Sequence, residues 1–449
     1  MTGLAQSRSN SAGKAVAGTT ALPVVPTTSS RLVTGLSTLI VAFLILMVFA
    51  SATGLTPYTY ALLAIGASIT SLALISLMRI RLTSTIISWL LFAVIAGIAA
   101  LRSGDIPFTM LATIVLGILL TANFGWEGSL TKSIAFISVP FAVVTIAMYL
   151  SDGVTAQVIS SLPLSDAIPG DYRSGATTHY TLNGILLSLG TLCLAPYAFT
   201  RSPRRAIWIT LLVIVAFALV LTTKRAHIAF AMLSLLLTYV MIGAAGNKRV
   251  RRLFNAAAIS AASFACAIPL ATYIPAMSRV VDRFIQATGD ESFNGRRAFY
   301  DVALSLWTDA PIVGQGWGTF TPAFNRTGAG LVFINQGFES INAHNVYLQL
   351  LAETGIVGLA AFLIAAITTL VCGVRLIRSS DQGYMSPRIQ PLVASSALQF
   401  FFLLYCLTGN PLYDLTFFVP YFISCSIIWS YQVMEQRSTR ILNARSHID

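Results

Sequence analysis

Charged residues are scarce in this chain. Only 10% of its 449 residues are Asp, Glu, Lys or Arg, whereas soluble domains average roughly 25%. This deficit argues against a water-exposed globular enzyme. Acidic residues are fewer than basic ones: 28 Lys and Arg residues against 16 Asp and Glu residues give a net charge of +12. The basic residues are dispersed between apolar runs with no continuous basic face, so we expect no nucleic-acid partner. The excess of basic over acidic residues instead indicates membrane topology.

Cysteine is also rare. The chain has five cysteines, and none forms a CxxC pair or a Cys/His cluster, so neither a zinc site nor a disulfide framework is indicated. All lie within or at the edge of apolar runs, where a free thiol packs like a small apolar residue: Cys193, Cys266, Cys372, Cys406 and Cys425. We expect neither a metal nor a cofactor.

Apolar runs are abundant instead. Hydrophobic residues make up 56% of the chain, and a transmembrane helix needs about 20 of them in succession. Runs of this kind lie near 33–52, 59–78, 82–101, 107–123, 131–150, 181–199, 206–222, 226–245, 255–275, 345–373, 391–408 and 412–431. The pattern predicts an all-α polytopic membrane protein with about 12 transmembrane helices.

The segments between the runs predict its organisation. Residues 1–30 are expected to form a disordered cytoplasmic tail, followed by helices 1–9 in 31–274, a large periplasmic loop in 275–344, helices 10–12 in 345–431 and a cytoplasmic tail in 432–449. A shorter outer loop occupies 151–180. Because Lys and Arg concentrate in cytoplasmic segments, and the short outer loops hold only Arg102, Lys224 and Arg225, we expect both termini in the cytoplasm.

The large loop shows helical periodicity. From Arg296, apolar residues recur three, six, seven, ten and eleven positions later, at Phe299, Val302, Ala303, Leu306 and Trp307. This helix of about 15 residues is too short to span a bilayer, so we expect it to lie along the membrane surface and to end before Pro311.

The run at 345–373 is longer than a bilayer requires. Gly355 and Gly358 follow Glu353, which favours a bend there; alternatively, the first two turns project from the membrane. Either arrangement brings His344 near the outer interface. Glu353 and Asp414, the acidic residues within the runs, are functional candidates or features of helix breaks and packing.

Cations at the outer boundary indicate the candidate site. Lys224, Arg225, Arg296 and His344 would together suit a phosphorylated lipid, because guanidinium groups match phosphate oxygens and a neutral imidazole accepts a proton. Each has an ordinary alternative. Arg225 could anchor at lipid headgroups, whereas Arg297 could pair with Asp301 one turn later. Arg296 shares the apolar stripe and is the better functional candidate. We interpret His179, His227 and His447 as structural.

Two motifs resemble the O-antigen ligase and O-antigen polymerase superfamily. One is Gly295–Phe320, with its Gly-Arg-Arg opening and Pro-Ile-Val-Gly-Gln-Gly-Trp-Gly close, and the other is Ala343–Gly358, in which His-Asn opens a helix leading to Glu-Thr-Gly. The resemblance implies a C-type glycosyltransferase of the bacterial inner membrane. It would take a glycan from undecaprenyl diphosphate at a periplasmic site, without metal, by inverting displacement.

The resemblance also implies residue roles. Arg225 and Arg296 would bind the diphosphate, and His344 would be the general base on the acceptor hydroxyl. Lys224, Arg297, Asn345 and Arg173 would contact substrate, the last from a Tyr-Arg-Ser-Gly element. Relatives commonly have a small polar residue where this chain has Lys224, which leaves open whether Lys224 or Arg225 meets the phosphate.

The sequence favours a ligase that transfers O-antigen onto lipid A-core. The grounds are the spacings of 71 residues from Arg225 to Arg296 and of 48 from Arg296 to His344, which resemble those of ligases. The alternative is a polymerase that joins lipid-linked repeat units of O-antigen or exopolysaccharide. A transporter of the same glycan is a third candidate, but it would favour polar midplane residues and internal repeats.

Overall fold

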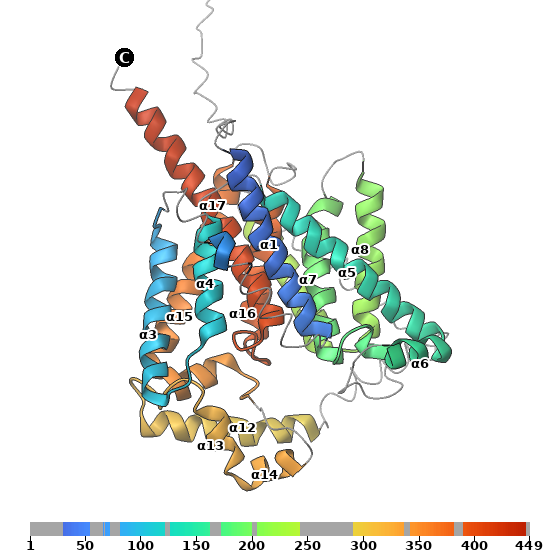
Figure 1. The fold of residues 1–449 in the computed structure, drawn as a ribbon, viewed down its shortest axis with the longest axis vertical. Helices are drawn as coiled ribbons and strands as arrows, with labels where there is room; N and C mark the ends of the chain where they lie inside the picture. The colour runs from blue at the N-terminus through green and yellow to red at the C-terminus, as the bar shows by residue number, and fades with distance from the viewer. Residues whose placement is uncertain are drawn as a thin grey trace, which may run out of the picture.

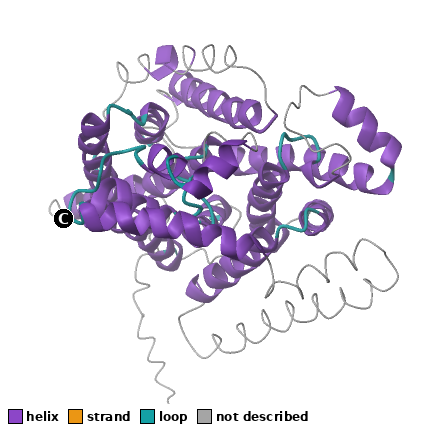
Figure 2. Cartoon of the chain, turned by 90° about the horizontal axis from the view of Figure 1, so that it is seen from below, coloured by secondary structure: helices purple, strands orange, loops and turns teal. Residues whose placement is uncertain are grey.

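The structure is a computed structural model that describes residues 30–53, 66, 68–71, 81–121, 126–161, 172–199, 204–242, 291–335, 342–380 and 389–445. Within these ranges the regular elements are helices, joined by turns and loops (Figure 2). The all-α fold class is therefore confirmed for the described part of the chain. Several predicted features lie largely or wholly outside it: the tail 1–30, the runs 59–78 and 255–275, Cys266 and His447.

Ten helices form a bundle in the described residues (Figure 1). They are α1 (Ser30–Thr53), α3 (Ser84–Ser103), α4 (Phe108–Leu120), α5 (Glu127–Leu150), α7 (Tyr180–Phe199), α8 (Arg205–Leu221), α9 (Arg225–Ile242), α15 (Val346–Ser379), α16 (Gln390–Tyr405) and α17 (Leu415–Arg445). Two short elements, α6 (Asp152–Ser161) and η1 (Tyr172–Ser174), connect α5 to α7. A layer of α12 (Glu291–Asp309), α13 (Phe320–Asn325) and α14 (Gly328–Asn335) lies across one end of the bundle.

Five helical stretches in the described ranges are long and apolar enough to cross a membrane: Ser84–Ser103, Thr131–Leu150, Tyr180–Phe199, Val346–Ser379 and Leu415–Arg437. Their surfaces match that role. On α3, Ile87, Leu91, Val94, Ile98 and Leu101 form a stripe at helical spacing, each more than half exposed. Such a stripe is unfavourable in water but is stable in contact with lipid tails. The chain is therefore a multi-pass membrane protein, and the number of spans stays a prediction.

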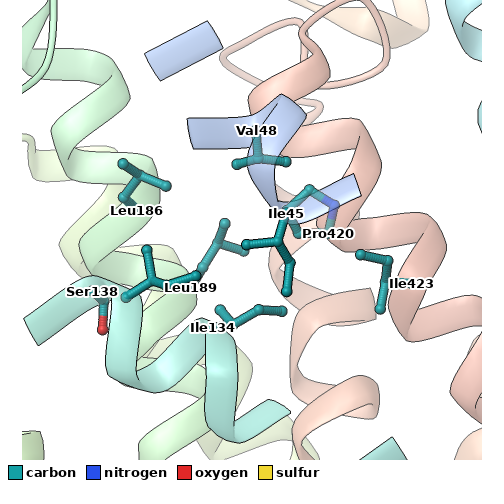
Figure 3. Close-up of a pocket in the computed structure, with 9 residues that line it drawn as sticks. Ile45, Val48, Ile134, Ser138, Leu186, Leu189, Pro420 and Ile423 are labelled. Carbon is teal, nitrogen blue, oxygen red and sulfur yellow. The ribbon is translucent and has the colours of Figure 1, made fainter. Parts of the chain in front are cut away.

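Aromatic packing fills the interior between α3, α15 and α17. Trp89 is fully buried, and its ring packs edge-on against Phe362 and Phe422. Its indole Nε1 donates to Thr369 Oγ1 at 3.1 Å, which satisfies the one polar atom of the ring inside an apolar layer. A second apolar region, a pocket between α1, α5, α7 and α17, is lined by aliphatic residues that include Ile45, Leu186 and Pro420 (Figure 3). Among the described residues of its lining, Ser138 is the one with a polar side chain.

The bend expected in the long run 345–373 is present. Gly355 has φ 65° and ψ −169°, which breaks α15. A loop fills the break: Gln315 N donates to Ala352 O at 2.9 Å and Ile356 N donates to Pro311 O at 3.0 Å. A Cβ at Gly355 would collide with the backbone carbonyl of Ile312. Glycine therefore permits both the left-handed backbone and the close approach of the loop.

The helix expected in the large loop is also present, as α12. Its apolar face does not need a membrane, because Phe299 and Ala303 are buried against Phe320 and Phe324 of α13. Ala343 and Ala352 complete this small core and connect it to the start of α15. The layer is thereby fixed to the end of the bundle, and it positions the residue that precedes Phe299 by one turn, Arg296.

Candidate active site

Polar side chains from five separate segments meet where α12 covers the end of the bundle. Arg173 comes from η1, Tyr180 from the first position of α7, Lys224 from the turn before α9, Arg296 from α12 and His344 from the turn before α15. All are at least partly solvent-accessible. A group assembled from segments so distant in the sequence depends on the tertiary fold.

Two cations share one aromatic ring. Lys224 Nζ lies 3.8 Å from the centroid of the Tyr180 ring, and Arg173 Cζ lies 4.9 Å from the same centroid. The imidazole of His179 packs on Tyr180 with ring centroids 4.1 Å apart. Cation–π contacts hold both positive groups to the electron-rich face of the ring. The arrangement concentrates positive charge around Tyr180.

His344 packs against α12. Its ring centroid is 5.4 Å from that of Phe299. Loss of hydration, together with the positive charges of Arg296 and Lys224, lowers the pKa of His344 to about 4. The imidazole is therefore neutral at pH 7 and can accept a proton.

Backbone strain marks the same place. Among the described non-glycine residues, Thr223 (φ 54°) and His344 (φ 51°) have left-handed backbones. One precedes Lys224 and the other is the candidate base. Left-handed non-glycine residues cost about 1–3 kcal/mol and cluster at functional sites. Neither position is a glycine, so no residue type in the sequence indicated the strain.

The two adjacent arginines of α12 lie on different faces of the helix, as their spacing predicts. Arg297 Nε lies 4.0 Å from Asp301 Oδ2, and the Arg297 side chain is 84% exposed. Arg296 is half-buried, and its charge acts on both His344 and Tyr405, the last residue of α16. Of the pair, Arg296 is the one that faces the candidate base.

Arg225 and Asn345 occupy helix starts. Arg225 is the first residue of α9, directly after Lys224. Asn345 is the N-cap of α15, and its Oδ1 accepts hydrogen bonds from the backbone N–H groups of Tyr347 at 3.0 Å and Leu348 at 3.2 Å. This cap fixes where α15 begins, immediately after His344.

Tyr405 and His227 belong to the site's surroundings, although the sequence pattern assigned neither of them a functional role. Their ring centroids are 4.7 Å apart, and His227 is 2% exposed, with neither ring nitrogen hydrogen-bonded to a described residue. Lys224 and His227 both approach Gly184 of α7. Their i, i+3 spacing is the signal that could have placed His227 on the same face as Lys224.

Glu353 and Asp414, the acidic residues within the apolar runs, both accept hydrogen bonds from neighbouring groups. Glu353 Oε2 accepts a hydrogen bond from the Tyr413 hydroxyl at 2.8 Å. Asp414 Oδ1 accepts from the backbone N–H of Thr416 at 2.9 Å, at the start of α17. Among the described residues no group of His, Cys, Asp or Glu could hold a metal ion. The site is a cationic cluster in which His344 is the candidate base.

Residues 209–363 match the family model described as O-antigen ligase. The resemblance to the O-antigen ligase and polymerase superfamily is confirmed. The matched segment runs from α8 into α15 and includes Lys224, Arg296 and His344, whereas Arg173 lies before it. No curated protein matches the chain. The O-antigen ligase match supports a glycosyltransferase-like enzyme that acts on lipid-linked glycans within a membrane.

Proposed function

We propose that this protein is an O-antigen ligase that transfers a glycan from undecaprenyl diphosphate to a lipid A-core acceptor on the periplasmic side of the bacterial inner membrane. The observation that carries the proposal is the position of the His344 imidazole, 5.4 Å from Phe299 of α12 and within reach of the charges of Arg296 and Lys224. Metal-free transfer from a diphosphate needs both a base for the acceptor and cations for the leaving group.

The reaction is a single displacement. His344 takes the proton of the acceptor hydroxyl as its oxygen bonds to the anomeric carbon of the donor glycan. The bond from that carbon to the diphosphate oxygen breaks, and the electron pair leaves with undecaprenyl diphosphate. Negative charge grows on the departing oxygens, so Arg296 and Lys224 stabilise the transition state more than the ground state. Attack opposite the leaving group inverts the anomeric configuration.

Donor binding would also prepare the base. In the free protein, loss of hydration together with the two cations keeps the pKa of His344 near 4, where an imidazole is a weak base. A bound diphosphate offsets these positive charges and raises the pKa of His344 toward its ordinary value of about 6.5. The base therefore becomes stronger once the donor is present, closer to the pKa at which general-base catalysis at neutral pH works best.

The identity of Lys224 bears on this assignment. Besides Arg296, Lys224 is the cation whose charge acts on His344, and Arg225 follows it at the start of α9. We assign the leaving-group contact nearest the base to Lys224 and retain Arg225 and Arg173 as phosphate ligands further along the donor. Arg297 and Asn345 then act mainly through α12 and the cap of α15.

A reconstituted assay tests the proposal. The purified protein is mixed with a lipid-linked glycan donor and, separately, with lipid A-core or with a second lipid-linked glycan. A glycan joined to lipid A-core supports the ligase, whereas extension of the second lipid-linked glycan indicates the polymerase. Donor that crosses the bilayer without a new glycosidic bond would contradict the transferase and indicate transport.

A deletion strain gives the same distinction in cells. Loss of a ligase leaves lipid A-core without O-antigen while carrier-linked polymer accumulates. Loss of a polymerase leaves a single repeat unit attached to the core. A deletion that leaves both the core-linked and the carrier-linked glycan unchanged would overturn both assignments.

A further inference from the structure

A buried amide lies directly beneath the candidate base. Gln349 of α15 is 1% exposed, and its side chain makes four hydrogen bonds. Its Oε1 accepts from Ala343 N at 3.1 Å and from Asn410 Nδ2 at 3.0 Å, and its Nε2 donates to Asn342 Oδ1 and to Glu353 Oε1, both at 3.1 Å. These bonds use both donors and both acceptor sites of the amide. A group so fully satisfied in a buried place has one preferred orientation.

The bond to Ala343 determines the backbone next to His344. The left-handed conformation of His344, with φ 51°, persists only where its neighbours are held. On one side Gln349 Oε1 holds the N–H of Ala343, and on the other the Asn345 cap fixes the first turn of α15. The strained residue therefore lies between two anchored neighbours, and its imidazole is directed by them.

Glu353 holds Gln349 in turn. The two residues are one helical turn apart, and Glu353 is completely buried. Its Oε2 accepts from Tyr413 in the turn before α17, and its Oε1 accepts from the backbone N–H of Phe320 at 3.5 Å. The pair thus connects the α12–α13 loop, the α16–α17 turn and the segment that carries His344.

We propose that Gln349 is a positioning residue for glycan transfer. Gln349 fixes the direction of the His344 imidazole through the backbone of Ala343, and Glu353 holds the side chain of Gln349 in place. The inference rests on the proposed function, since it assumes that His344 accepts the proton from the acceptor. It assigns no contact with substrate to Gln349. Its effect should therefore appear in kcat and leave the donor KM unchanged.

The first test removes the amide and keeps the size of the side chain. Gln349→Met should lower kcat about 10–100-fold, because misplacing a reacting group by about 1 Å costs that much, with the donor KM within about threefold of the parent. The matched control is Gln399→Met in α16, a fully buried amide that donates to Ser424 Oγ at 2.6 Å. The control should retain the parental kcat. Parental kcat in Gln349→Met, or an equal loss in both variants, would overturn the assignment.

The second test exchanges the two groups. Gln349→Glu places two carboxylates side by side, and their repulsion should lower kcat at least as much as Gln349→Met does. The double substitution Gln349→Glu/Glu353→Gln restores one amide and one carboxylate in exchanged places. It should recover kcat at least tenfold over Gln349→Glu alone, with thermal unfolding of all three measured beside it. If kcat does not recover in a double variant that is as heat-stable as the parent, the proposal that Glu353 holds Gln349 in place is wrong.

The outcomes separate this inference from the function itself. A parent protein that forms no glycosidic bond contradicts the proposed transferase. A parent that transfers glycan, with His344→Ala inactive and Gln349→Met at parental kcat, contradicts only the positioning role. Transfer that falls in Gln349→Met and returns in the exchanged pair supports both.

Discussion

Lys224 Nζ lies 3.8 Å from the centre of the Tyr180 ring, although 44 positions separate the two residues in the chain. The contact brings the start of α7 against the turn before α9. Arg173 reaches the same ring, so Tyr180 holds two cations that would otherwise repel each other. Periodicity and spacing did not single out this ring.

The first prediction separates Lys224 from Arg225. Lys224→Met should lower kcat/KM for the donor about 10²–10³-fold, the usual cost of removing one group that stabilises leaving-group charge. Arg225→Met should lower kcat/KM less, because of these two neighbours Lys224 is the one whose charge acts on His344. Steady-state kinetics of both purified variants decide the point. A larger loss in Arg225→Met would assign the contact nearest the base to Arg225.

The second prediction separates the neighbouring arginines of α12. Arg296→Ala should abolish measurable transfer, and His344→Ala should do the same, with membrane insertion intact in both. Arg297→Ala should retain activity within about fivefold, since its exposed pair with Asp301 contributes about 0–1 kcal/mol. Transfer assays on membranes with matched protein amounts provide the comparison. Substantial activity in Arg296→Ala would remove it from the site.

The third prediction concerns pH. A general base must be unprotonated, and protonation of His344 occurs only below its pKa of about 4 in the free protein. The value of kcat/KM, which reports the free enzyme, should therefore fall only as the pH drops toward 4. The acid limb of kcat should lie at higher pH, because the bound diphosphate raises the pKa of His344.

Lys224→Met provides the control for that pH dependence. Removing one positive charge raises the pKa of His344, so the acid limb of kcat/KM should move to higher pH than in the parent. A limb that does not move would mean that loss of hydration, and not the neighbouring charge, sets the pKa.

Periodicity and spacing predicted the local features of this protein. The apolar stripe from Phe299 to Trp307 predicted the helix α12 and the inward face of Arg296, and Glu-Thr-Gly predicted the break in α15. The features that periodicity could not supply are tertiary. The shared ring of Tyr180, the approach of His227 to Tyr405 and the four bonds of Gln349 join segments that no local pattern relates. The available signal for Gln349 was a polar residue inside an apolar run, five positions after His344. A glutamine in such a run does not reveal its partners.

The fourth prediction concerns Gly355, where α15 breaks. Gly355→Ala must place a Cβ at φ 65° and against the carbonyl of Ile312. The left-handed backbone alone costs about 1 kcal/mol or more, and the loop that covers the break must also move. The melting temperature of the purified protein should fall, and transfer should fall with it, because the loop and Glu353 share this junction. The matched control is Gly97→Ala in α3, where a Cβ meets no atom within 4 Å; its melting temperature should be unchanged or slightly higher. Equal stability of the two variants would mean that the Pro311–Gly316 loop does not depend on the glycine at the break.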